Sequence, residues 1–182
     1  MPLGTGRTAG RPLDSGTISY YTLWYEIVLQ EDVMQGKSRE SLNRFNYLFG
    51  ETEALYHEMA HKLGLSDSAM KILYTVCDTG EPCPLQEVCR RSGLSKQTVN
   101  SALRKLEREQ VLYLETAGGR GKQVRLTESG RKLAESTVLR IIEIENAVFG
   151  AWAPEDVQTY LALTERFLND VKQRAAALDS CL

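Results

Sequence analysis

Two histidines one helical turn apart lie in a segment whose residue types could bind a metal ion and activate water. Residues 57–67 read His-Glu-Met-Ala-His-Lys-Leu-Gly-Leu-Ser-Asp, which fits the pattern HExxHxxGxxD. In zinc proteases of this pattern two histidines and the aspartate bind the metal, and the glutamate activates water. A zinc-dependent peptidase that uses the His57-Glu58-x-x-His61 segment is therefore one hypothesis for the function.

Three features of the same segment disfavour the peptidase. Lys62 puts a charge beside the second histidine, where the zinc-protease pattern prefers an uncharged residue. Residues 64–66 are already explained as the stop of one helix and the start of the next. These are the only two histidines of the chain, and the sequence that follows offers no substrate cleft. We therefore expect no catalytic residues, no cofactor and no metal, with a regulatory metal at His57 and His61 as the less favoured alternative.

The cysteines offer a second chemistry. Cys77, Cys83, Cys89 and Cys181 are irregularly spaced and no secretion leader is recognisable, so we expect reduced thiols. Cys83 precedes Pro84 at the predicted start of a helix, where the helix dipole can lower a thiol pKa and favour oxidation. A redox switch at Cys83 is one hypothesis, and we favour the alternative that Cys83 and Cys89 are small apolar fillers.

The strongest signal is a pair of helices that meet at a glycine-containing turn. Residues 84–91 and 95–106 have helical patterns, and residues 92–94 break them. Ser95 is expected to cap the second helix. The buried face of this helix is predicted to carry Val99, Ala102, Leu103 and Leu106. The opposite face carries side chains that can donate to base edges and phosphates in a major groove: Lys96, Gln97, Asn100, Ser101 and Arg104.

A basic hairpin is predicted after this helix. Residues 111–116 and 123–126 are β-prone, and the glycine-rich connection between them holds Arg120 and Lys122. Residues 84–132 contain eleven Lys and Arg against five Glu, which gives +6 in a chain of net charge −2. Such a concentration of positive charge favours contact with nucleic-acid phosphates. Helix, turn, helix and hairpin together predict a winged helix-turn-helix.

Long amphipathic helices are predicted on both sides of this module. Residues 39–63 carry a heptad seam, residues 128–149 form a second long helix, and a third begins at Pro154. These apolar faces exceed what the small module can cover, so we expect a two-fold homodimer with recognition helices about 34 Å apart. A larger intramolecular helical bundle is the alternative.

Length and composition suit one compact protein. The chain has 182 residues, 42% of them hydrophobic, and no apolar run as long as a membrane helix, so we expect a cytoplasmic protein. Residues 1–17 have almost nothing to bury and are expected to be disordered. We expect three parts: an N-terminal extension (1–35), a helical dimerisation region (36–66 and 133–182) and a winged helix-turn-helix DNA-binding region (67–132).

Residues 94–99, 106–107 and 111–112, the Arg120 tip and residues 126–130 resemble the MarR family of winged-helix transcription regulators. The resemblance covers roughly residues 38–178 and is strongest through the DNA-binding segment. It implies a mainly α-helical fold with a two-stranded β-wing, and a homodimer that binds palindromic DNA and responds to a small ligand or an oxidant. It also implies minor-groove insertion of Arg120 and major-groove roles for seven residues: Ser95, Lys96, Gln97, Thr98, Asn100, Ser101 and Arg104.

The resemblance further implies an effector pocket between the dimer helices and the DNA-binding part. Its aromatic candidates are Phe45, Phe49, Tyr56 and Tyr74, although core packing is the favoured role for each. The function expected from the sequence is thus that of a homodimeric DNA-binding regulator that represses transcription by occupying promoter DNA. A winged-helix module that binds protein instead of DNA is a third hypothesis.

Overall fold

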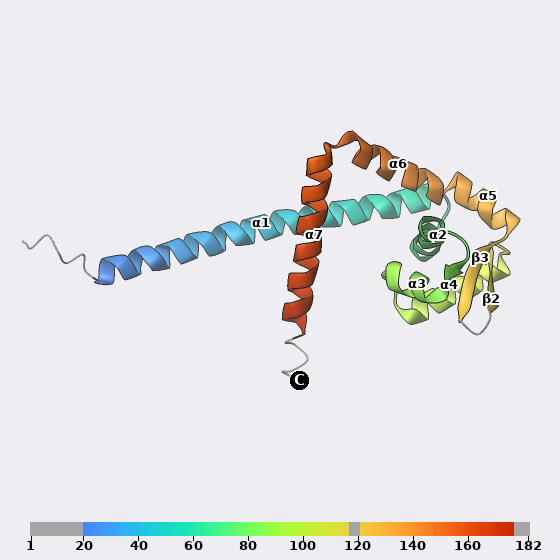
Figure 1. The fold of residues 1–182 in the computed structure, drawn as a ribbon, viewed down its shortest axis with the longest axis horizontal. Helices are drawn as coiled ribbons and strands as arrows, with labels where there is room; N and C mark the ends of the chain where they lie inside the picture. Colours follow the sequence, from blue (N-terminus) through green and yellow to red (C-terminus); the bar gives the residue numbers. More distant parts are fainter. Residues whose placement is uncertain (1–19, 117–120, 177–182) are drawn as a thin grey trace, which may run out of the picture. The chain divides into compact units, whose positions relative to one another are not determined.

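A computed structural model describes the backbone of residues 20–116 and 121–176, and the side chains of these residues from residue 36 onward. The chain divides into two compact units, residues 1–54 and residues 55–182. The described elements, in chain order, are α1 (Tyr20–Lys62), α2 (Asp67–Thr79), β1 (Cys83–Pro84), α3 (Leu85–Arg91), α4 (Lys96–Arg108), β2 (Leu112–Thr116), β3 (Lys122–Leu126), α5 (Glu128–Ser136), α6 (Val138–Ala151) and α7 (Pro154–Ala175) (Figure 1).

The fold is mainly α-helical with a small antiparallel sheet, as the sequence predicts. The sheet is three-stranded in the order β1-β3-β2, so a short strand that the sequence does not reveal joins the predicted two-stranded wing. Its register pairs Leu112 with Leu126 and Cys83 with Val124. β1 has only two residues, too few for an alternating pattern, and this explains why the sequence gives no sign of it.

The core of the second unit lies between α2, the helix pair α3–α4, the sheet and the helices α5 and α6. Ile72, Leu73 and Val76 of α2 are fully buried, and the other fully buried side chains come from the surrounding elements and, in the case of Ala60, from the end of α1. Figure 1 shows these elements gathered around α2. The largest fully buried side chains outside α2 are those of Leu103, Leu112, Ile141, Val88, Val99, Val124 and Val138.

Gly130 fixes the close approach of α5 to the sheet. A Cβ atom built at this position would lie 1.8 Å from the carbonyl oxygen of Val111. The same carbonyl accepts a hydrogen bond from the Thr127 amide at 3.0 Å, and the Thr127 hydroxyl caps α5 by accepting from the Gly130 amide. Glycine is therefore required here because a backbone carbonyl occupies the space of a side chain.

The long helices differ from the sequence prediction in two places. α1 begins at Tyr20 and not near residue 39, since no proline interrupts the run to Lys62. The predicted single helix over 128–149 is broken at Thr137, whose φ and ψ of −129° and −91° are not helical. Thr137 is buried, and its hydroxyl donates to the Leu133 carbonyl at 2.6 Å. α7 begins at Pro154 as predicted.

Much of the apolar surface of the long helices is exposed. None of the 22 residues of α7 is buried. In the first unit, Leu42, Phe45, Leu48 and Phe49 of α1 are also exposed. No helix in the described part of the chain is long and apolar enough to cross a membrane.

Candidate nucleic-acid interface

The turn between α3 and α4 positions the start of α4. Gly93 has a φ of +66°, a value that glycine adopts without strain. Ser95 is the N-cap of α4, as predicted, and its hydroxyl oxygen accepts a hydrogen bond from the Thr98 amide at 3.1 Å. The direction of the first turn of α4 is thereby fixed by the backbone and by a local side chain.

Helix α4 separates its apolar and polar residues onto two faces. Val99, Leu103 and Leu106 are buried against the core, and Ala102 packs beside them, as the sequence predicts. All seven residues for which the family resemblance implies major-groove roles are exposed: Ser95, Lys96, Gln97, Thr98, Asn100, Ser101 and Arg104. The structure therefore brings the predicted set together on one surface.

The polar face of α4 borders an open hollow of about 1090 Å³. Five of the predicted residues line it, and Glu107 and Arg108 extend the lining toward the end of the helix. The sequence reasoning did not include Arg108, although its position four residues after Arg104 could have indicated it. The hollow is lined mainly by hydrogen-bond donors, which suits the acceptor-rich edges of bases and phosphates.

Charge pairing divides the cations of this module into two groups. Arg90 pairs with Glu87 at 2.7 Å, Arg91 pairs with Asp78, and Arg125 pairs with Glu115. Within the described part of the chain, by contrast, Lys96 and Arg104 have no ion-pair partner. The positive charges of Lys96 and Arg104 on the exposed face of α4 are therefore not neutralised within the described part of the module.

Lys96 is in an electrostatically unfavourable position for an isolated helix. It is the first residue of α4, and the first turn of this helix contains no acidic side chain. A cation near a helix N-terminus is opposed by the helix dipole by about 0.3–1 kcal/mol at an exposed site. A phosphate group placed there would be attracted both by the lysine and by the free amides of the first turn.

The wing is described only at its base. Lys122, the first residue of β3, is exposed and is paired in register with Thr116. The hydrogen bond from Arg125 to Glu115 across the hairpin raises the pKa of Arg125, so this arginine belongs to the wing's own scaffold. Arg120 lies outside the described residues, and its minor-groove role stays a prediction.

The effector candidates are divided between the two units. Phe45 and Phe49 stack on each other at 6.1 Å in the first unit and are exposed. Tyr56 and Tyr74, in the second unit, are half-buried and both donate to the carboxylate of Glu145 on α6, Tyr74 at 2.5 Å. Burial and the hydrogen bond to Glu145 raise the pKa of both tyrosines, which therefore remain protonated donors. The sequence reasoning missed Glu145, because its partners lie far away in the chain.

The geometry at Cys83 differs from the prediction. The N-cap of α3 is Pro84, while Cys83 lies in β1 opposite Val124 and is fully buried. Burial, the largest of several effects, raises the pKa of the Cys83 thiol, whereas the redox hypothesis required a lowered one. The prediction that Cys83 caps the helix is wrong because the residue pairs with β3 before the helix begins.

The residues of the peptidase pattern lie where α1 ends and α2 begins. Glu58, the residue that would have to activate water, pairs with Lys62 at 3.5 Å. His57 and His61 are exposed, and the Asp67 carboxylate contacts His57 at 2.9 Å. This ion pair joins two helices of the second unit.

Comparisons with known proteins agree with this geometry. Residues 63–123 match the model of the MarR family. A MarR family regulator from Neisseria meningitidis has a similar structure, with a TM-score of 0.63 and 18% identity over 76% of this chain and 98% of that one. No curated protein matches the sequence significantly.

Two structures from Staphylococcus aureus are also similar. One is a MarR in complex with salicylate and kanamycin, with a TM-score of 0.58 and 19% identity over 77% of this chain and 95% of that one. The other is a MepR–DNA complex, with a TM-score of 0.54 and 17% identity over 86% of this chain and 99% of that one. At these identities the likeness is one of fold.

Proposed function

We propose that the protein, whose residues 63–123 match the model of the MarR family, is a sequence-specific DNA-binding transcription regulator. The observation that carries the proposal is the exposed face of α4. It presents amide, hydroxyl and guanidinium groups that can read base edges, together with Lys96 and Arg104, which form no ion pair in the described part of the chain. The concentration of positive charge in residues 84–132 supplies the phosphate attraction that such binding needs.

In this proposal α4 enters the major groove. Ser95, Lys96 and Thr98 at its start contact phosphates and the first bases, and Asn100, Ser101 and Arg104 reach base edges farther along the groove. Gln97 can make a bidentate contact with adenine. Lys122 at the base of the wing and Arg120 at its tip contact the neighbouring minor groove.

We further propose that the protein acts as a homodimer. Most of the stability of a helix in a protein comes from packing of its apolar face, yet none of the 22 residues of α7 is buried, and Leu161 and Leu168 are exposed. Phe149, Trp152 and Tyr160 form an aromatic cluster with ring centroids 5.3–6.1 Å apart, and Phe149 and Trp152 are themselves about 40% exposed. Covering such surfaces by a second copy under two-fold symmetry would give two α4 helices for a palindromic site.

We propose that the protein regulates transcription by binding to promoter DNA in the cytoplasm. A dimer that covers a promoter excludes polymerase, so repression is the expected direction. A small organic effector is favoured over an oxidant, because Cys83 is buried and its thiol pKa is raised. The paired donors Tyr56 and Tyr74 and the acceptor Glu145 connect α1, α2 and α6, so a ligand that competes for these hydrogen bonds could change the separation of the two α4 helices.

Selection from a pool of random duplexes tests the proposal. We expect enrichment of a palindromic sequence whose half-site centres are separated by about 10 base pairs or a multiple of that distance. Genome-wide mapping of bound sites should recover the same sequence in promoter regions. A pool that remains random after repeated rounds, with a protein that is folded, would refute DNA recognition and favour a protein-interaction module.

A further inference from the structure

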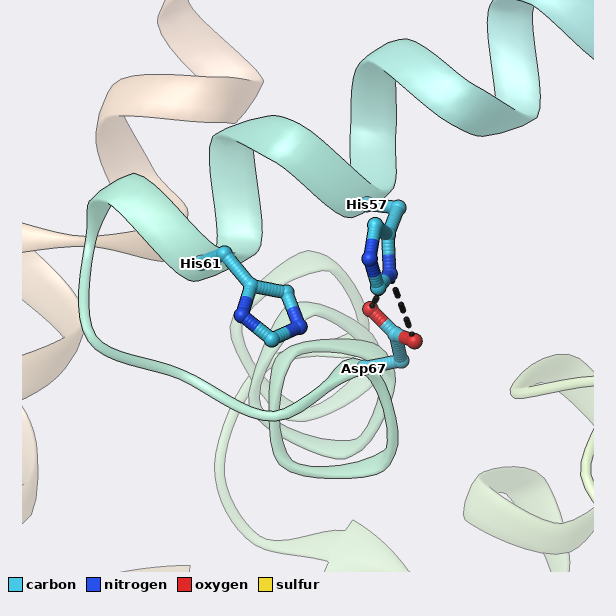
Figure 2. Close-up of side chains that lie close together, drawn as sticks. All are labelled: His57, His61 and Asp67. Atoms are coloured by element: carbon cyan, nitrogen blue, oxygen red, sulfur yellow. Dashed lines mark hydrogen bonds and ion pairs between the residues drawn. The ribbon is translucent and has the colours of Figure 1, made fainter.

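Three side chains with metal-binding atoms converge where α1 gives way to α2. His57 and His61 are four positions apart in the sequence, and therefore lie on one face of α1. Gly64, with a φ of +75°, turns the chain, and Asp67 is the first residue of α2. Figure 2 shows the Asp67 carboxylate directed at the His57 ring, with the His61 ring beside them.

The spacing of the ligand atoms is close to that of a metal site. One atom from each of the three residues can be chosen so that all lie within 4.8 Å of one another. His57 Nδ1 lies 2.9 Å from both carboxylate oxygens of Asp67, and the two imidazole centroids are 4.3 Å apart. Ligand atoms of a tetrahedral zinc ion, at bond lengths of about 2.0–2.1 Å, are about 3.3 Å apart.

We propose that His57, His61 and Asp67 form a binding site for a divalent transition-metal ion, with Zn²⁺ as the ion that best matches the ligands. Two imidazoles and one carboxylate are common zinc ligands. Three protein ligands leave one coordination position for water.

The site can close around an ion with little rearrangement. His57 and His61 are exposed and Asp67 is half-exposed, so side-chain rotations meet little packing resistance. Asp67 is also free of a capping role. Ser66 caps α2 by accepting from the Ala69 amide at 3.3 Å.

The His57–Asp67 ion pair alone is the competing explanation of the cluster. An exposed pair of this kind contributes little to stability, and it gives no reason for a second imidazole beside the first. Metal coordination uses all three groups, and it would tie the last turns of α1 to the first turn of α2.

Metal binding by the untagged full-length protein, measured without DNA, tests the proposal separately from the proposed regulatory function. After removal of metal with a chelator, Zn²⁺ is titrated by isothermal calorimetry. We expect one ion per chain and a rise in melting temperature with added Zn²⁺. His57→Ala, His61→Ala and Asp67→Asn should each weaken binding by about 100-fold or more, since even outer-shell partners are worth about 10–100-fold.

Glu58→Gln is the matched control. It removes a charge from the same helical turn, but its carboxylate pairs with Lys62 and is not a proposed ligand, so Zn²⁺ affinity should be unchanged. The absorption of the Co²⁺-substituted protein gives an answer even if a variant fails to fold. Tetrahedral d–d bands without thiolate charge transfer are expected. Thiolate bands, or a stoichiometry unaffected by the three ligand substitutions, would overturn the proposal.

Discussion

Replacing Arg104 by alanine tests whether the exposed face of α4 reads DNA. Arg104 is exposed, and it makes no ion pair within the described part of the chain. The substitution leaves no buried group unpaired, so the free energy of unfolding should change by no more than about 0.5 kcal/mol. Loss of an arginine contact with a base costs about 1–3 kcal/mol for each recognition helix. A dimer that uses two helices should therefore lose about 2–6 kcal/mol, or about 30-fold or more in affinity.

Arg90→Ala is the control for this substitution. Arg90 carries the same charge and lies in the same module, but on α3, where it pairs with Glu87 at 2.7 Å. Fluorescence anisotropy on a selected duplex at several salt concentrations measures both variants. We expect Arg90→Ala to stay near the unsubstituted affinity. Equal losses from both variants would mean that only net charge matters, and an unchanged Arg104→Ala protein would refute the major-groove assignment.

Three further substitutions or reactions test other parts of the structure. Gly130→Ala should destabilise the fold by about 1–3 kcal/mol in urea unfolding, because its Cβ meets a backbone carbonyl, whereas Gly150→Ala, with open space around it, should not. Equal stability of the two variants would contradict the close approach at α5. Glu145→Ala should cost about 2 kcal/mol, since two tyrosine hydroxyls lose their acceptor; an unchanged unfolding midpoint would argue against that junction. At pH 7 to 8, iodoacetamide should label Cys83 far more slowly in the folded protein than in urea, because its raised pKa and burial keep the thiol protonated and covered. Rapid labelling of the folded protein with loss of DNA binding would restore the redox hypothesis.

The parts of the fold that the sequence predicts are those determined by neighbouring residues. The cap at Ser95 and the two faces of α4 follow from local spacing, and both are confirmed. The start of α7 at Pro154 follows from the fixed φ of proline. The base of the wing lies where β-prone runs flank a glycine-rich connection.

The features that the sequence does not predict depend on contacts between distant residues. β1 exists because Cys83 pairs with Val124, and this pairing removes Cys83 from the predicted helix cap. The break at Thr137 interrupts an apolar pattern that suits one continuous helix. Glu145 gains its role from tyrosines on two other helices. Local patterns carry no information on such partners.

The salt dependence of binding to a selected duplex, measured together with its stoichiometry, tests the central claim most directly. We predict two chains per duplex and an affinity that falls steeply with salt, because several phosphates are neutralised by each module. The same protein should bind a scrambled duplex at least about 1,000-fold more weakly. Binding that does not depend on salt, a stoichiometry of one chain per duplex, or equal affinity for the scrambled sequence would contradict a homodimer that binds DNA through two recognition helices.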